Sequence, residues 1–124
     1  LYPVELMNRL IVVTGGTKGI GRAIAERFAA AGFDVATCAR HEADLVLFQT
    51  TLQQKYSVKA HVFRADISKV KEIQTFTSFI HQLNHPVDVL VNNAGYFVPG
   101  SVMEEPEGTL ESMIQSNVYS AYYT

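Results

Sequence analysis

The sequence predicts a doubly wound α/β fold, in which helices cover both faces of a parallel sheet of about four strands. Short apolar runs that fit buried strands alternate with longer segments of helical periodicity, and the links between them are short. The first apolar run also leads through three spaced glycines straight into a helix. Because short links between alternating strands and helices imply right-handed crossovers, these observations favour one domain built on a parallel sheet.

The first half of the chain supplies two strand–helix units and a third strand. Strands are expected over residues 9–14, 34–39 and 58–64, where the apolar runs have the length of buried strands. Gly32 is expected to end the first helix. The predicted inner faces are Ile20, Ala23, Ile24, Phe28 and Ala31 in the first helix, and Leu45, Phe48, Leu52 and Tyr56 in the second.

The second half adds a helix, a strand and a final helix. Ser68 is expected to cap the third helix, Pro86 to end it, and residues 87–91 to form the fourth strand. The final helix reaches Thr124 without a stop signal. The predicted apolar stripes are Val70, Ile73, Phe76, Phe79, Ile80 and Leu83 in the third helix, and Leu110, Met113, Ile114, Val118 and Ala121 in the last.

Composition narrows the classes of function. The chain has 124 residues, of which 48% are hydrophobic and 18% charged, as in an ordinary globular domain. A net charge of -2 without a basic cluster argues against nucleic acid or a membrane surface as partner. The single Cys38 excludes a disulfide within the chain, and His81 with His85 lacks a third ligand, so no metal site is predicted. We expect a cytoplasmic protein that binds small molecules.

Residues 1–6 are predicted to be an extension of unknown origin. They lack the parts of a signal peptide, and no apolar run in the chain approaches the roughly 20 residues that span a bilayer. Met7 opens the run Met-Asn-Arg-Leu-Ile, which is typical of a natural start. The predicted domain therefore covers residues 7–124.

The glycines Gly15, Gly19 and Gly21 predict a site for a nucleotide diphosphate. They remove side chains where the backbone must turn sharply, and the first amides of the following helix are unpaired donors suited to an anion. A nucleoside-triphosphate loop would need Lys and Ser or Thr where Arg22 and Ala23 stand. A purely structural glycine turn is the remaining alternative.

Four motifs in register resemble the short-chain dehydrogenase/reductase family: the segment 14–21, Asp66 with Ile67, the Asn-Asn-Ala-Gly segment 92–95, and Asn117. The resemblance covers residues 9–124. It implies a Rossmann-like NAD(P)-binding domain with an incomplete sheet, from an oxidoreductase that moves a hydride between a nicotinamide cofactor and an alcohol or carbonyl. The cofactor-binding residues that it implies are Gly15, Gly19, Ile20, Gly21, Asp66, Ile67, Asn93, Ala94 and Gly95, and the predicted site also includes Thr17, Lys18 and Arg40.

Two of these positions have alternative explanations. Asp66 directly follows a strand and is expected beside the adenine ring, but it also fits a turn or cap before Ser68. Asn93, Ala94 and Gly95 are expected to border the nicotinamide riboside. Asn92 is expected to have the structural role of tying neighbouring strands and loops together.

NADP is the expected cofactor, and NAD is less favoured. Ala39 stands near the end of the second strand, where NAD-preferring relatives commonly have an acid, and Arg40 and Lys18 are nearby bases that suit a second phosphate. The alternative is that both bases merely face solvent.

Only one residue of the family's proton-transfer group is present. The resemblance implies a Tyr followed four residues later by Lys, with a Ser before them, and this sequence lacks that group. It also implies an Asn that holds a water in the proton relay, which Asn117 matches. Asn117 falls inside the apolar stripe of the last helix, so its amide is expected to be buried with partners. The alternative is an Asn bonded locally to backbone.

The first functional hypothesis is therefore the cofactor-binding part of an NADP-dependent reductase or dehydrogenase. Its substrate would be a small carbonyl or alcohol, and the full-length protein would be a homo-oligomer. A chain of these 124 residues alone is expected to be inactive, because it lacks the proton donor. The second hypothesis is a non-catalytic dinucleotide-binding or regulatory module that ends naturally here. Asn117 and residues 92–95 count against other nucleotide-binding α/β proteins.

Overall fold

Four parallel strands form one sheet in the order β3-β2-β1-β4. The computed structural model describes residues 7–96, 98–101 and 103–124, so the extension predicted over residues 1–6 lies outside the described residues. The predicted strands are present and differ only at their ends. Their bounds are β1 (Leu10–Thr14), β2 (Asp34–Ala39), β3 (Ala60–Arg64) and the short β4 (Val89–Val91).

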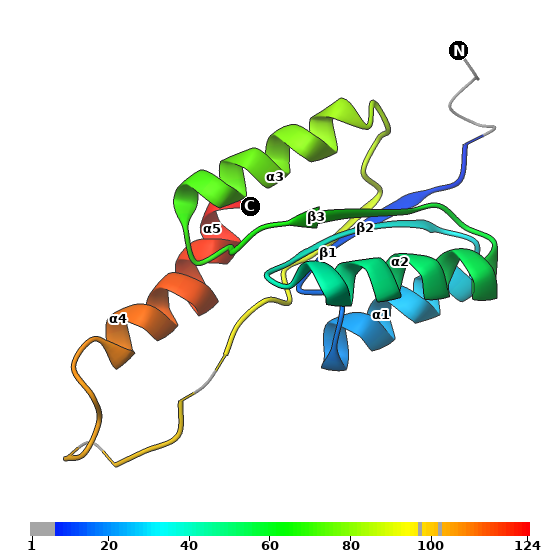
Figure 1. Ribbon diagram of the computed structural model, residues 1–124. Coiled ribbons are helices and arrows are strands. Elements are labelled where there is room, and N and C mark those ends of the chain that lie inside the picture. The colour runs from blue at the N-terminus through cyan, green and yellow to red at the C-terminus, as the bar shows by residue number, and fades with distance from the viewer. Residues whose placement is uncertain (1–6, 97, 102) are drawn as a thin grey trace.

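Helices cover both faces of the sheet, which confirms the doubly wound architecture (Figure 1). One face carries α1 (Gly19–Ala30) and α2 (Glu42–Tyr56). The other face carries α3 (Val70–Gln82) and a C-terminal helical segment that packs against α3. That segment consists of α4 (Thr109–Ile114), a π-helical turn, η2 (Gln115–Tyr119), and α5 (Ser120–Tyr123).

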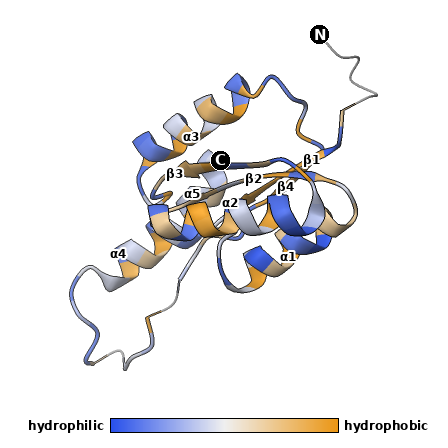
Figure 2. Cartoon of the chain, turned by 45° about the vertical axis from the view of Figure 1, so that its right-hand side comes forward, coloured by the Kyte–Doolittle hydropathy of each residue, from blue (hydrophilic) through white to orange (hydrophobic). Residues whose placement is uncertain are grey.

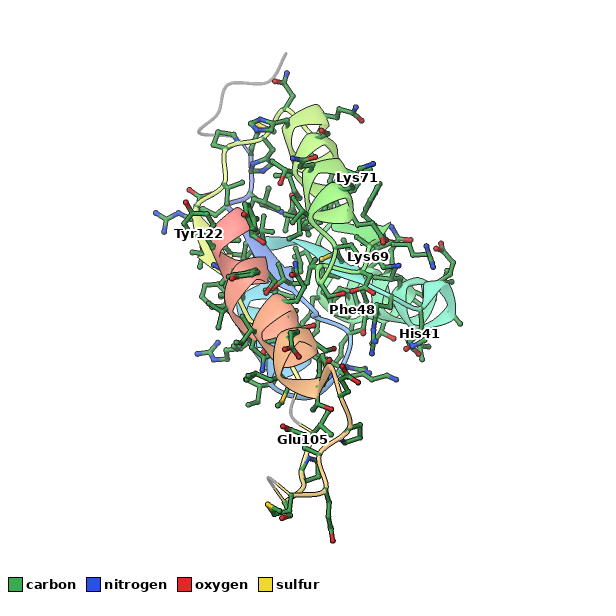
Figure 3. All side chains as sticks on the ribbon, turned by 90° about the vertical axis from the view of Figure 1, so that its left-hand side faces the viewer. His41, Phe48, Lys69, Lys71, Glu105 and Tyr122 are labelled. Atoms are coloured by element: carbon green, nitrogen blue, oxygen red, sulfur yellow. The ribbon has the colours of Figure 1, made fainter. Side chains whose placement is uncertain are left out.

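The alternation of side chains along β1 produces two hydrophobic cores. Ile11 and Val13 face α1 and α2, whereas Leu10 and Val12 face α3. The strands are largely hydrophobic and lie between helices that carry both hydrophobic and hydrophilic residues (Figure 2). Among the labelled side chains, Phe48 lies inside the molecule, while Lys71 and Tyr122 lie at its surface (Figure 3).

The predicted inner face of α2 is confirmed, but that of α1 is partly wrong. Gly21, Ala25 and Ala29 are the buried residues of α1, and Ile20 is 75% exposed. Small side chains let a helix approach a sheet closely, so the face of small residues packs on β1 and β2. The larger Ile24 and Phe28 lie at its border, half-buried, while Ala23 and Ala31 are exposed.

The start of α3 differs from the prediction. The residue that precedes the helix is Lys69, and no side chain caps the first turn. The Ser68 hydroxyl instead donates to Asp66 Oδ1 at 2.6 Å, and the Asp66 backbone N–H donates to Glu72 Oε1 at 3.0 Å. Ser68 is therefore not the cap, because its hydroxyl is committed to the turn formed by Asp66.

The expected burial of the last helical stripe is also wrong. Leu110, Ile114 and Val118 are exposed, and Asn117 is exposed with them, while Ser116 and Ser120 are buried. For Asn117 and Val118, part of the reason is η2, because a π turn adds a residue to the helical repeat and changes the face that these two residues occupy. In addition, the sheet of the described residues ends at β4, so the outer side of this segment has no strand to pack on.

Replacing Phe76 tests the α3 core. This ring is 1% exposed and stacks on Phe79, so Phe76→Ala should lower the free energy of unfolding of the full-length protein by about 3–5 kcal/mol. Leu47→Ala is the control, because Leu47 is 61% exposed and should change it by about 0.5 kcal/mol or less. Denaturant unfolding measures both. Equal effects would contradict the assignment of this core.

Candidate functional site

A cavity of about 840 Å³ opens at the carboxyl ends of the strands. The glycine loop (residues 15–21) forms one side, and the segments after β2, β3 and β4 form most of the rest. Ser112 of α4 and Ser116 of η2, which the sequence did not indicate, also line it. Gly19, Gly21 and Asn117 do not line it. The other predicted residues do: Gly15, Thr17, Lys18 and Ile20 from the loop, Arg40 after β2, Asp66 and Ile67 after β3, and Asn93, Ala94 and Gly95 after β4.

The end of β2 holds the start of the glycine loop. The Gly15 N–H donates to the Cys38 carbonyl at 2.9 Å, and the Gly16 N–H donates to Thr37 Oγ1 at 2.9 Å. The Thr37 hydroxyl in turn donates to the Val13 carbonyl at 2.5 Å. Gly15 and Gly19 have backbone φ values of +66° and +57°, which residues other than glycine rarely adopt. Thr37 was not predicted from the sequence, since a buried Thr in a strand has no distinctive spacing.

Asn93 ties the end of β1 to the end of β4. Its side-chain N–H group donates to the Thr14 and Gly15 carbonyls, both at 3.1 Å. The Thr14 hydroxyl oxygen accepts the Asn93 and Ala94 backbone N–H groups at 3.0 and 3.1 Å. The structural role predicted for Asn92 was therefore wrong, because Asn92 is exposed and the neighbouring amide makes these bonds.

Position 21 requires glycine because of its contacts with Gly15 and Asn93, and not because a ligand needs space there. A Cβ at Gly21 would lie 2.6 Å from the Gly15 carbonyl oxygen and would also meet the Asn93 side chain. The third glycine of the motif thus lets α1 pack against the loop and Asn93.

Charged side chains of both signs line the β2 side of the cavity. Lys18 Nζ lies 3.2 Å from Asp44 Oδ2, on the first turn of α2. Partial burial alone would raise the pKa of Asp66, but hydrogen bonds from the Ser68 hydroxyl and N–H, together with the charges of Arg40 and Lys69, hold this pKa below its ordinary value. Asp66 is therefore a carboxylate at neutral pH. Asp66 also forms the turn with Ser68 that the sequence offered as its alternative role. This turn is compatible with a contact to the adenine ring.

Cys38 lies at the base of the cavity as a neutral thiol. It is buried, and burial raises the pKa of the Cys38 thiol to about 12. It therefore contributes an apolar surface to the cavity and no charge.

Asn117 holds the segment after β4 from outside the cavity lining. Its Oδ1 accepts the Tyr96 N–H, and its Nδ2 donates to the Tyr96 carbonyl, both at 2.7 Å. The Tyr96 hydroxyl also bonds the Ser112 hydroxyl. A Cβ at Gly95 would lie 2.6 Å from Asn117 Oδ1, so this approach requires glycine. The amide is partnered as expected, but its partner is backbone 21 residues away, which is not the local bond of the alternative.

The part of the chain that the structure describes contains neither a candidate metal site nor a candidate membrane-spanning helix. No group of three His, Cys, Asp or Glu residues there is arranged to hold a metal ion. None of the helices found within the described ranges combines the length and the apolar character needed to cross a bilayer.

Residues 9–124 match the family model described as short chain dehydrogenase. The chain belongs to the short-chain dehydrogenase family. Its four-stranded sheet is accordingly the Rossmann-like sheet that the sequence motifs implied.

Relatives and solved structures agree with this assignment. A short chain dehydrogenase of Pseudocercospora fijiensis is 37% identical over 83% of this chain and 33% of its own. An alcohol dehydrogenase of Thermococcus sibiricus, complexed with 5-hydroxy-NADP, is 30% identical over 95% of this chain and 50% of its own, with a TM-score of 0.90. The L-sorbose reductase of Gluconobacter frateurii, complexed with NADPH and L-sorbose, has 26% identity, a TM-score of 0.88, and coverage of 95% and 45%. This short-chain dehydrogenase sequence thus spans a third to half of these relatives.

Replacing Gly21 tests the junction of β1, α1 and β4. Gly21→Ala should displace the Asn93 amide and lower the free energy of unfolding of the full-length protein by about 1–3 kcal/mol, the cost of leaving partly buried polar groups unpaired. In Gly100→Ala, the matched control, the added Cβ meets open space, and the change should stay within about 0.5 kcal/mol. Denaturant unfolding without cofactor compares them. A Gly21→Ala protein as stable as the control would contradict the packing described.

Proposed function

We propose that the full-length protein is an NADP(H)-dependent oxidoreductase that transfers a hydride between the cofactor and a small carbonyl or alcohol substrate. The residues of this sequence form its cofactor-binding part. The observation that carries the proposal is the cavity at the carboxyl ends of the parallel strands, bounded by the glycine loop and by residues 93–95. Dinucleotides bind at this place in open α/β sheets.

The residues around the cavity fit the parts of a dinucleotide. The first amides of α1 would hold the pyrophosphate, because they are unpaired donors at the positive end of the helix. Ile20 lines the cavity and is exposed, so its side chain is free to cover the cofactor. The ionised Asp66 can accept a hydrogen bond from the adenine amino group, with Ile67 beside the ring. When bound, the nicotinamide would supply or accept the hydride, next to residues 93–95.

Three observations favour NADP over NAD. The β2 edge of the cavity has Ala39 in place of an acid that would bond the ribose hydroxyls. Lys18 and Arg40 line the same edge and can pair with a phosphate. In addition, the Thermococcus dehydrogenase and the Gluconobacter reductase are complexed with 5-hydroxy-NADP and NADPH respectively.

The proposal predicts that the full-length protein binds NADPH about 10- to 100-fold more tightly than NADH, because each charge-assisted contact contributes about 1.5 kcal/mol. Calorimetric titration with both cofactors measures this preference. Oxidation of NADPH with a panel of small carbonyl compounds tests the reaction. NADPH binding without turnover of any substrate would favour a non-catalytic dinucleotide-binding module, and tighter binding of NADH would contradict NADP dependence.

A matched pair of arginine variants locates the preference. Arg40→Ala should lose about tenfold in NADPH affinity and leave NADH affinity within a few-fold, because only the extra phosphate is unpaired. Arg64→Ala is the control, since Arg64 is exposed at the end of β3 and does not line the cavity. Equal losses in the two variants would mean that the preference depends on overall charge alone.

For catalysis, we propose that Asn117 acts as a positioning residue. The sequence has no Tyr followed four residues later by Lys, so the proton donor is not among these residues. The Asn117 amide is occupied by the Tyr96 backbone and therefore fixes the segment that follows Gly95. This segment borders the cavity where the nicotinamide is proposed to bind. Any water that Asn117 helps to hold for a proton relay would depend on the same anchoring.

Asn117→Ala should lower the turnover number of the full-length enzyme by about 100-fold, since small misplacement of reacting groups costs that much. Its NADPH affinity should stay within a few-fold. Tyr96→Phe is the control, because it removes the hydroxyl bond to Ser112 and keeps both backbone bonds to Asn117. Steady-state kinetics and NADPH titration separate the two effects. Unchanged turnover in a folded Asn117→Ala protein would leave Asn117 with a packing role only.

A further inference from the structure

We propose that Asp44 is a specificity-determining residue that limits the preference for NADP, because its carboxylate holds Lys18 in the empty site and repels the extra phosphate in the filled one. The inference rests on the proposed NADP dependence and names a residue of the same site. Arg40 and Lys18 alone would make the site strongly cationic. Asp44 lies on the first turn of α2, pairs with Lys18 of the glycine loop and opposes that charge.

The ion pair joins two residues that line the same edge of the cavity. Lys18 Nζ and Asp44 Oδ2 are 3.2 Å apart, and both residues line the cavity together with Arg40 and His41. The Asp44 side chain is 31% exposed and the Lys18 side chain 74% exposed. The carboxylate is thus held in place by its helix, whereas the ammonium sits on a long side chain in solvent.

This difference in exposure decides which partner moves. An exposed ion pair contributes little to stability, so Lys18 can leave Asp44 for a phosphate at small cost. Asp44 cannot withdraw in the same way, because it belongs to the first turn of α2. A bound phosphate therefore gains Lys18 but still faces a carboxylate of the same sign.

The second cation of the site is opposed in a similar manner. Arg40 is close enough to Asp66 for its charge to help lower the pKa of that carboxyl. Each base that suits the phosphate therefore has a carboxylate of the cavity nearby, Lys18 with Asp44 and Arg40 with Asp66. Asp66 also makes the turn before α3, which leaves Asp44 as the carboxylate whose charge can be removed without disturbing a loop.

Removing that charge should favour NADPH selectively. Asp44→Asn should tighten NADPH binding roughly three- to tenfold at low salt, while NADH affinity stays within about twofold, because NADH lacks the repelled phosphate. The gain should shrink as ionic strength rises from about 0.01 to 1 M, since the Debye length then falls from about 30 to about 3 Å. Calorimetric titration of the full-length protein with both cofactors measures these constants.

Glu42 provides a matched control on the same helix turn. Glu42→Gln removes an equal charge from the first turn of α2, but Glu42 is exposed and does not line the cavity, so NADPH affinity should stay within about twofold. Asp44→Glu keeps the charge and should retain the wild-type preference. Asp44→Ser replaces Asp44→Asn if melting temperatures show that the latter is not folded.

The double variant tests the transfer of Lys18. In a Lys18→Gln background, the gain from Asp44→Asn should be smaller than in the wild type, because no ammonium is released. An equal gain would overturn the transfer. Equal effects of Asp44→Asn and Glu42→Gln would overturn the role of Asp44, as would a loss of NADH affinity in Asp44→Asn, which would assign the carboxylate to the ribose hydroxyls.

The proposed function fails separately from this inference. A wild-type protein that does not prefer NADPH contradicts the NADP dependence on which the inference rests. A wild-type preference for NADPH that Asp44→Asn leaves unchanged contradicts the role of Asp44 alone.

Discussion

The hydrogen bonds between Asn93 and the end of β1 are the constraint on which the site depends. β4 has only three residues in the sheet, so its ladder to β1 is short. The Thr14 hydroxyl and the Asn93 amide extend this connection past the last paired residues and into the loops of both strands. Gly21 follows from the same bonds, because a side chain there would displace the Asn93 amide. The third glycine of the motif is thus a packing requirement.

The charges of the site are balanced before any ligand binds. Lys18 and Arg40 suit a phosphate, but Asp44 and Asp66 line the same cavity. Paired surface charges cost little to separate, whereas a carboxylate fixed on a helix keeps repelling an anion after its partner has moved. The selectivity of such a site for a phosphate depends on the difference between attraction by the bases and repulsion by the carboxylates. A count of basic residues alone therefore overestimates this selectivity.

The C-terminal helical segment contributes to the site through Ser112 and Ser116, which line the cavity, and through Asn117, which anchors the segment after β4. Asn117 bonds both sides of the Tyr96 backbone, and this brings η2 against the segment that follows β4. The amide could make these bonds only because Gly95 has no side chain. The apolar residues of the same segment remain exposed, so polar bonds as well as its packing on α3 hold this part of the chain in place.

The sequence by itself determined the fold class, the family and the order of the strands and helices. These depend on the spacing of apolar residues and glycines along the chain, and the structure and the family match confirm them. The inner face of α1, the start of α3 and the burial around Asn117 were predicted wrongly, and the roles of the individual site residues remain predictions. Only the tertiary structure decided that Asn93 and not Asn92 joins the strands, and that Lys18 is paired with Asp44. The reason is that Thr14 and Asn93 are 79 residues apart, and periodicity along a chain carries no information about partners at that distance.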